Sequence, residues 1–167
     1  SSDVCSSDLP FHLRIAQFWI ARSFTQALHQ RDDMVSITME YQGNLHCRAI
    51  HDPSGTELFT DAPADNQGKA ESFSPTDLVA TALGTCILTV MGLKAQALNI
   101  DISGATATVE KAMASGPRRI SRLATKIVIP HALSADQKRL LERTALTCPV
   151  HKSMSPEIEM PIDFIWG

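Results

Sequence analysis

Two cysteines lie in stretches of sequence that could support redox chemistry. Cys86 ends the run SPTDLVATALGTC, and Cys148 begins the stretch CPVHKS. If the fold draws the two thiols together, one thiolate can attack the O–O bond of a peroxide and become a sulfenic acid, and the other can condense with it to a disulfide. This chemistry needs no metal ion. The two stretches therefore raise the hypothesis of a two-thiol redox site.

Cys86 also has a simpler interpretation. It lies about three turns into a predicted helix, too deep for the dipole at the helix amino terminus to stabilise a thiolate. A reactive Cys86 would need a cationic or hydrogen-bonding neighbour, and without one it is a small buried hydrophobic residue. Cys148 favours the redox interpretation, because it lies at a helix end next to Pro149, with the polar residues His151 and Lys152 close by.

The spacing of Cys148 and His151 raises two further hypotheses. A zinc site could use both residues, but further ligands do not lie nearby in the sequence. A Cys-His hydrolase would need a third group to orient the histidine, and none is evident. We therefore expect neither a metal nor a cofactor. Cys47 lies on one face of a predicted strand with other apolar residues, and we interpret it as part of the core.

The stretch that carries Cys86 has a strong signal for the start of a helix. Ser74 can cap the helix, Pro75 suits its first position, and Asp77 can complete a capping box. The pattern predicts a helix to about Leu98. Each interior glycine costs about 1 kcal/mol relative to alanine, which indicates that another element approaches the helix closely. Because one domain of this size offers few helices as cover, we expect a homodimer that buries this helix.

The remaining sequence predicts an α+β fold whose sheet is mainly antiparallel. A second helix begins at Ser134 and has Leu140, Leu141 and Leu146 on its buried side. Pro161 indicates that the last strand lies at an edge of the sheet. The expected strands span residues 35–42, 45–51, 56–62, 100–114, 118–129 and 157–166.

The amino-terminal segment differs from the rest of the chain. Its first nine residues, SSDVCSSDL, are rich in serine and aspartate, and the first methionine is Met34. Residues 11–30 have apolar residues at helical spacing, which is compatible with a short amphipathic helix. We expect residues 1–33 to be a leader outside the fold and residues 34–167 to form a single domain.

Composition excludes several classes of protein. The chain has 167 residues, a formal net charge of -3 and a pI near 6.0, which argues against binding to nucleic acid. The uncharged stretch 78–93 is shorter than the ~18 apolar residues of a membrane span. No secretion signal is recognisable, and four widely spaced cysteines without a CxxC motif indicate reduced thiols. We therefore expect a cytoplasmic protein that binds no membrane.

The two cysteine stretches, SPTDLVATALGTCILTVMG and TCPVHKS, resemble the OsmC/Ohr family of osmotically inducible and organic hydroperoxide resistance proteins. The resemblance extends from Met34 to the carboxyl end. It implies an intertwined α+β homodimer with two central helices and with active sites at the dimer interface. It also implies a thiol-dependent peroxidase that reduces organic or fatty hydroperoxides and is regenerated by an external thiol.

The resemblance assigns roles to particular residues. Cys86 corresponds to the peroxidatic cysteine and Cys148 to the resolving cysteine. One branch of the family has a glutamate where this chain has Thr76, so Asp77 is either its substitute or only a helix cap. The same branch uses an arginine from the early strands, for which Arg48 is the candidate, although Arg48 can also be an ordinary solvated strand residue. The alternative function is a non-catalytic dimer that binds an apolar ligand at its interface.

Overall fold

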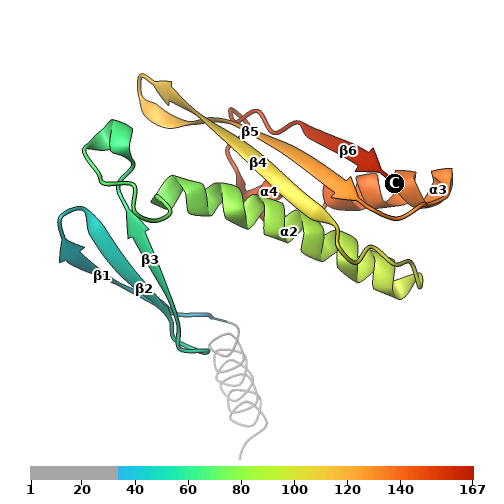
Figure 1. The fold of residues 1–167 in the computed structure, drawn as a ribbon, viewed down its shortest axis with the longest axis horizontal. Helices are drawn as coiled ribbons and strands as arrows, with labels where there is room; N and C mark the ends of the chain where they lie inside the picture. Colours follow the sequence, from blue (N-terminus) through green and yellow to red (C-terminus); the bar gives the residue numbers. More distant parts are fainter. Residues whose placement is uncertain (1–33) are drawn as a thin grey trace, which may run out of the picture. The chain divides into compact units, whose positions relative to one another are not determined.

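The computed structural model describes residues 34–167, which form two compact units (Figure 1). The first unit contains residues 34–40 and 48–58, and the second contains residues 41–47 and 59–167. The leader predicted for residues 1–33 lies outside the described residues.

Three strands form the first sheet, in the order β1-β2-β3. β1 (Ile37–Gly43) and β2 (His46–His51) are joined by a tight turn, and β3 (Thr56–Asp61) follows a second turn. Gly43, Asn44 and Leu45 all have positive φ angles, which glycine and asparagine adopt readily, so Gly43 and Asn44 suit the first turn. The three strands predicted at the start of the domain are confirmed.

The second sheet has the order β4-β5-β6. β4 (Thr106–Ser115) and β5 (Arg118–Ile129) form the predicted long antiparallel hairpin. β6 (Ile162–Trp166) lies at the edge of the sheet, as Pro161 predicts, and pairs with β5 in parallel. The carbonyl of Pro161 still accepts a hydrogen bond from the amide of Thr125 at 2.9 Å.

The core of the second unit lies between this sheet and the long helix α2 (Pro75–Ala97), which runs along the sheet in Figure 1. α3 (Ala135–Ala145) and the short α4 (Pro149–Ser153) also pack against α2. Full burial of one large aliphatic side chain contributes about 1.5–3 kcal/mol, so this layer supplies much of the stability of the unit. The fully buried members are Leu83, Ile87, Met91, Leu123, Ile127, Ile129 and Leu141.

The two glycines of α2 have different surroundings. A Cβ atom at Gly84 would lie 3.1 Å from Cγ2 of Val109 and 3.5 Å from Cβ of Ala107, so β4 passes close to the helix there. A Cβ atom at Gly92 would meet nothing within 4 Å. The predicted close approach is therefore confirmed at Gly84, whereas no described residue makes such an approach at Gly92.

The second predicted helix is confirmed as α3, with Ser134 and Gln137 forming its capping box. Leu141 is completely buried, whereas Leu146 is 48% exposed. The prediction that Leu146 lies on the buried side is wrong, because the helix ends at Ala145 and Leu146 is its carboxyl-terminal cap.

Within residues 34–167, α2 is the helix that is long and apolar enough to cross a membrane by length and composition. Its buried side, however, packs against β4, α3 and α4, as expected of a core helix. Four residues at intervals of four along α2 stay exposed in the single chain: Thr81, Thr85, Thr89 and Leu93.

Candidate active site

The start of α2 is fixed by a complete capping box. The hydroxyl of Ser74 accepts a hydrogen bond from the amide of Asp77 at 3.2 Å, and the carboxylate of Asp77 accepts one from the amide of Ser74 at 2.8 Å. Pro75 occupies the first helical position, where its missing N–H group costs nothing. The sequence signal for this helix start is therefore confirmed in detail.

Asp77 has a second partner, which the sequence analysis missed. Lys111 of β4 places its ammonium group 2.6 Å from Oδ1 of Asp77 and 2.7 Å from the hydroxyl of Thr76. Burial raises the pKa of Asp77, but hydrogen bonds from Lys111 and Ser74 outweigh it and lower this pKa to about 2. Asp77 is thus ionised and fully engaged in holding the first turn of α2 to β4.

The sequence around Lys111 contains a pattern that predicts an inward-facing lysine. Side chains of β4 alternate between the two faces of the sheet, and Lys111 shares the inward face with Ala107, Val109 and Met113. A largely buried lysine on this otherwise apolar face needs an acidic partner. Asp77 supplies it across the sheet–helix interface.

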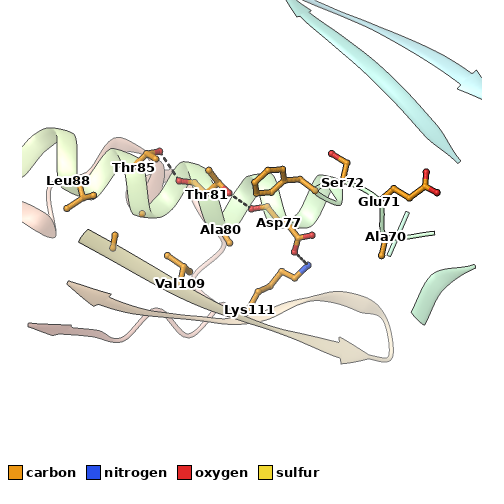
Figure 2. A pocket seen from close by; sticks show the side chains of 13 residues that line it. Ala70, Glu71, Ser72, Asp77, Ala80, Thr81, Thr85, Leu88, Val109 and Lys111 are labelled. Carbon is orange, nitrogen blue, oxygen red and sulfur yellow. Dashed lines mark hydrogen bonds and ion pairs between the residues drawn. The ribbon is translucent and has the colours of Figure 1, made fainter. Parts of the chain in front are cut away.

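Helical geometry separates Asp77 from Cys86. Cys86 follows Asp77 by nine positions, which corresponds to about 13.5 Å along the helix axis and places the two side chains on opposite sides of the helix. The side of Asp77 borders an open groove of about 880 Å³, which Figure 2 shows between α2 and β4. Thr81, Thr85 and Val109 line this groove, and Cys86 does not. Within one chain, therefore, Asp77 does not assist Cys86.

Cys86 and Cys148 are brought together by the packing of α4 against α2. The thiol of Cys148 lies close enough to Cys86 to raise its own pKa through that contact, and both cysteines are free thiols. Cys148 is completely buried, whereas Cys86 is only partly buried. Two residues more than sixty positions apart in the sequence thus form one pair.

The environment of Cys148 favours its protonated form. Burial raises the pKa of this thiol, the contact with Cys86 raises it further, and a hydrogen bond from the amide of His151 at 3.4 Å opposes them. The net pKa is above the usual value for cysteine. At neutral pH Cys148 therefore keeps its proton, and its S–H group can donate a hydrogen bond to the sulfur of Cys86.

Arg48 lies on β2 in the first unit and pairs with Glu57 of β3. Its Nε donates to Oε2 of Glu57 at 3.0 Å, and a second hydrogen bond joins Nη2 to Oε1. The hydrogen bond with Glu57 raises the pKa of Arg48, and the same bond lowers the pKa of Glu57. Arg48 thus has a carboxylate partner of its own, which the sequence analysis did not identify.

Cys47 is half-buried and lines a small hollow of about 350 Å³. Tyr41, Pro63 and Met113 contribute apolar surface to the same hollow, and Arg118 lies at its margin with an ion pair to Asp65 at 2.9 Å. The hollow is mainly apolar, so its lining suits a small hydrophobic group.

Comparison of the sequence with known protein families identifies the family of this chain. The sequence matches the family of OsmC-like proteins over residues 68–163, more than half of the chain. The chain belongs to the OsmC-like family. The matched region contains Asp77, Cys86, Lys111 and Cys148, and it leaves out Arg48. A search of curated proteins gives no match.

Solved structures agree with membership of the OsmC-like family. A protein from Psychrobacter arcticus 273-4, described in terms of osmotic stress and a detoxification response, is 47% identical, with a TM-score of 0.76 over 78% of this chain and 96% of the other. An OsmC-like protein from Mycoplasma pneumoniae is 19% identical, with a TM-score of 0.69 over 81% and 98%. An organic hydroperoxide resistance protein from Legionella pneumophila is 16% identical, with a TM-score of 0.64 over 79% and 96%. The last two likenesses concern the fold.

The link between Lys111 and Asp77 in this OsmC-like chain is testable through stability. Replacing Lys111 by Met removes the cation, so the pKa of Asp77 should rise from about 2 towards 3.8. The variant should lose about 1 kcal/mol of unfolding free energy at neutral pH, a value that allows for partial exposure of the pair. Because the folded-state pKa of Asp77 is depressed, the stability difference between the variant and wild type should have its full size above pH 3.8. It should shrink as the pH falls to about 2. Urea unfolding of wild type, Lys111→Met and the exposed control Lys126→Met would measure it; an equal loss at every pH would contradict the assignment.

Proposed function

We propose that this protein is a thiol-dependent peroxidase that reduces organic hydroperoxides through Cys86 and Cys148. The observation that carries the proposal is the contact between the two free thiols, one buried and one partly exposed. Family membership agrees with it, since OsmC relatives include organic hydroperoxide resistance proteins.

The environments of the two sulfurs support a division of roles. Cys86 is the partly exposed thiol, so a substrate can reach it. Cys148 keeps its proton and can stabilise a Cys86 thiolate by donating a hydrogen bond to it, which would supply the neighbour that a mid-helix thiolate requires. Cys86 is then the nucleophile, and Cys148 is the thiol that resolves the oxidised product.

The proposed reaction has two steps. The Cys86 thiolate attacks the distal oxygen of the hydroperoxide, the O–O bond breaks, and the alkoxide takes up a proton and leaves as the alcohol. Cys148 then attacks the sulfur of the sulfenic acid, which forms the disulfide and releases water. An external dithiol restores both thiols and is itself oxidised to a disulfide.

The roles predict different outcomes for the two serine variants. Cys86→Ser should abolish hydroperoxide reduction, whereas Cys148→Ser should still reduce one equivalent and then accumulate sulfenic or sulfinic acid at Cys86. Treatment with one equivalent of cumene hydroperoxide, followed by mass spectrometry of the peptides, would detect the Cys86–Cys148 disulfide in the wild-type chain. Cys47→Ser serves as the matched control and should behave as wild type. Full peroxide consumption by Cys86→Ser would refute the proposal.

We further propose that the protein is a homodimer in which a second copy covers the exposed side of α2. The stripe formed by Thr81, Thr85, Thr89 and Leu93 carries no charge. The three threonine hydroxyls donate to carbonyl oxygens four residues earlier, at 2.8–3.0 Å, so the stripe presents mainly methyl groups. Gly92, with open space where its side chain would be, leaves room for a close partner.

A charge placed on this stripe tests the dimer. Thr85→Lys would put an ammonium group into the proposed interface, and it should shift the protein to monomers in analytical ultracentrifugation. Ala132→Lys adds the same charge at an exposed loop position and should leave the dimer intact. A Thr85→Lys protein that sediments as wild type would exclude this surface as the interface.

A second candidate function is the binding of an apolar ligand without catalysis. The apolar hollow beside Cys47 favours it, because about 350 Å³ suffices for a small hydrophobic group. In that case Cys86 and Cys148 should stay reduced after exposure to cumene hydroperoxide, and a ligand should be recovered by organic extraction of the purified protein.

We propose that the domain that performs this function spans residues 34–167, which include Cys86 and Cys148. Because the mechanism depends on thiols that are returned to the reduced state, we propose a reducing compartment, the cytoplasm, as its location.

A further inference from the structure

The hollow beside Cys47 lies apart from the thiol pair. All of the residues that line it belong to the second unit. It meets α2 at the first turn of the helix, through Pro75 and Thr76. Cys86 follows Thr76 by ten positions, about 15 Å along the helix axis, and neither Cys86 nor Cys148 lines the hollow. The hollow is therefore a separate site on the same unit.

Most of the surface of this hollow is apolar and accessible. Aromatic, aliphatic and sulfur-containing side chains supply it: Tyr41, Leu45, Ala62, Pro63, Pro75 and Met113. Tyr41 and Leu45 are both exposed, so water covers part of this apolar surface in the single chain. A ligand with an apolar body gains free energy when it displaces that water.

Arg118 is the one charged residue among the described residues that line the hollow. Its Nη2 atom donates to Oδ2 of Asp65 at 2.9 Å, and a guanidinium has further N–H groups for a second acceptor. Both side chains of this ion pair are largely exposed, so the pair itself contributes little stability. Asn66 also lines the hollow, and its side-chain amide is a second donor. These donors suit an anionic group.

The larger groove between α2 and β4 carries different charges. Asp77 and Glu71 place carboxylates along it, and its cation, Lys111, is already paired with Asp77 at 2.6 Å. An anionic ligand in that groove would meet like charges, which repel it. The hollow beside Cys47 combines an apolar surface with a cation and has no carboxylate among its described lining residues. It is therefore the better match for an apolar molecule with an anionic end.

We propose that the hollow beside Cys47 binds a small carboxylic acid that has an apolar chain. The chain covers the apolar surface that includes Met113, and the carboxylate pairs with Arg118, whose planar guanidinium matches it in geometry. Binding involves no redox step, so this inference goes beyond the proposed peroxidase function and does not depend on it. The required anionic group distinguishes this ligand from the purely apolar ligand of the second candidate function.

Octanoate is a suitable probe, and octan-1-ol, which has the same chain length and no charge, is the matched control ligand. Each is titrated into the full chain, and binding is followed by the NMR shifts of the backbone amides of Cys47 and Met113. Octanoate should bind at least about tenfold more tightly than octan-1-ol, the usual effect of a hydrogen bond to a charged group. Equal affinities for the two ligands would overturn the inference.

Three variants test the pairing with the carboxylate. Arg118→Met keeps an apolar stem and removes the cation, so octanoate affinity should fall about tenfold while octan-1-ol affinity stays unchanged. Asp65→Asn removes the competing carboxylate, so octanoate should bind as tightly as to wild type or more tightly. Arg119 does not line the hollow and pairs with Glu157 at 3.4 Å, so Arg119→Met should bind octanoate as wild type does. Unchanged affinity in Arg118→Met, or equal losses in the two arginine variants, would overturn the inference.

The thiol of Cys47 reports where the acid binds in the wild-type chain. Saturating octanoate should slow the alkylation of Cys47 by iodoacetamide, measured by mass spectrometry of the peptides, and should leave the alkylation of Cys86 unchanged. Protection of Cys86 without protection of Cys47 would overturn the inference, because the acid would then occupy the thiol pair. If cumene hydroperoxide produces no disulfide but octanoate protects Cys47, the proposed peroxidase function fails and this inference stands.

Discussion

The close contact between α2 and β4 is the constraint on which the candidate site depends. A Cβ atom at Gly84 would lie only 3.1 Å from Cγ2 of Val109 on β4. The ion pair between Lys111 and Asp77 links the first turn of the helix to the same strand. Contacts at these two points fix the rotation of the helix about its own axis. With 100° per residue, Cys86 then points away from β4, towards the side where α4 packs. The position of the thiol is therefore set by contacts that involve no sulfur.

Because the rotation of α2 is fixed, its sides have different surroundings. Its buried side builds the core through Leu83, Ile87 and Met91. The side of Cys86 carries the thiol pair, and the threonine stripe has its hydroxyls satisfied within the helix. Because Cys86 lies on α2 and Cys148 caps α4, any change in how α4 packs against α2 alters the distance between the two sulfurs. The proposed reaction therefore depends on how α4 packs against α2.

Local signals explain how much could be predicted from the sequence. The start of α2 and the capping box of α3 follow from short motifs, because a cap depends only on neighbouring residues. Pairings between elements were out of reach. The partner of Arg48 on β3 depends on strand register, and the partner of Asp77 on β4 depends on how α2 packs on the sheet; alternation shows only that Lys111 faces inward. The parallel direction of β6 depends on the path of the chain through α3 and α4. The proximity of Cys86 and Cys148 came from a resemblance, since no local pattern encodes it.

The wide separation of the paired thiols along the chain has a thermodynamic consequence. A disulfide between Cys86 and Cys148 would close a loop of roughly sixty residues, which in the chain-entropy description restricts the unfolded ensemble by about 4 kcal/mol. Oxidation would thus leave a chain that resists heat and proteolysis better than its reduced form. Each catalytic cycle would alternate between a less stable and a more stable protein, and the thermal stability of a sample would report its redox state.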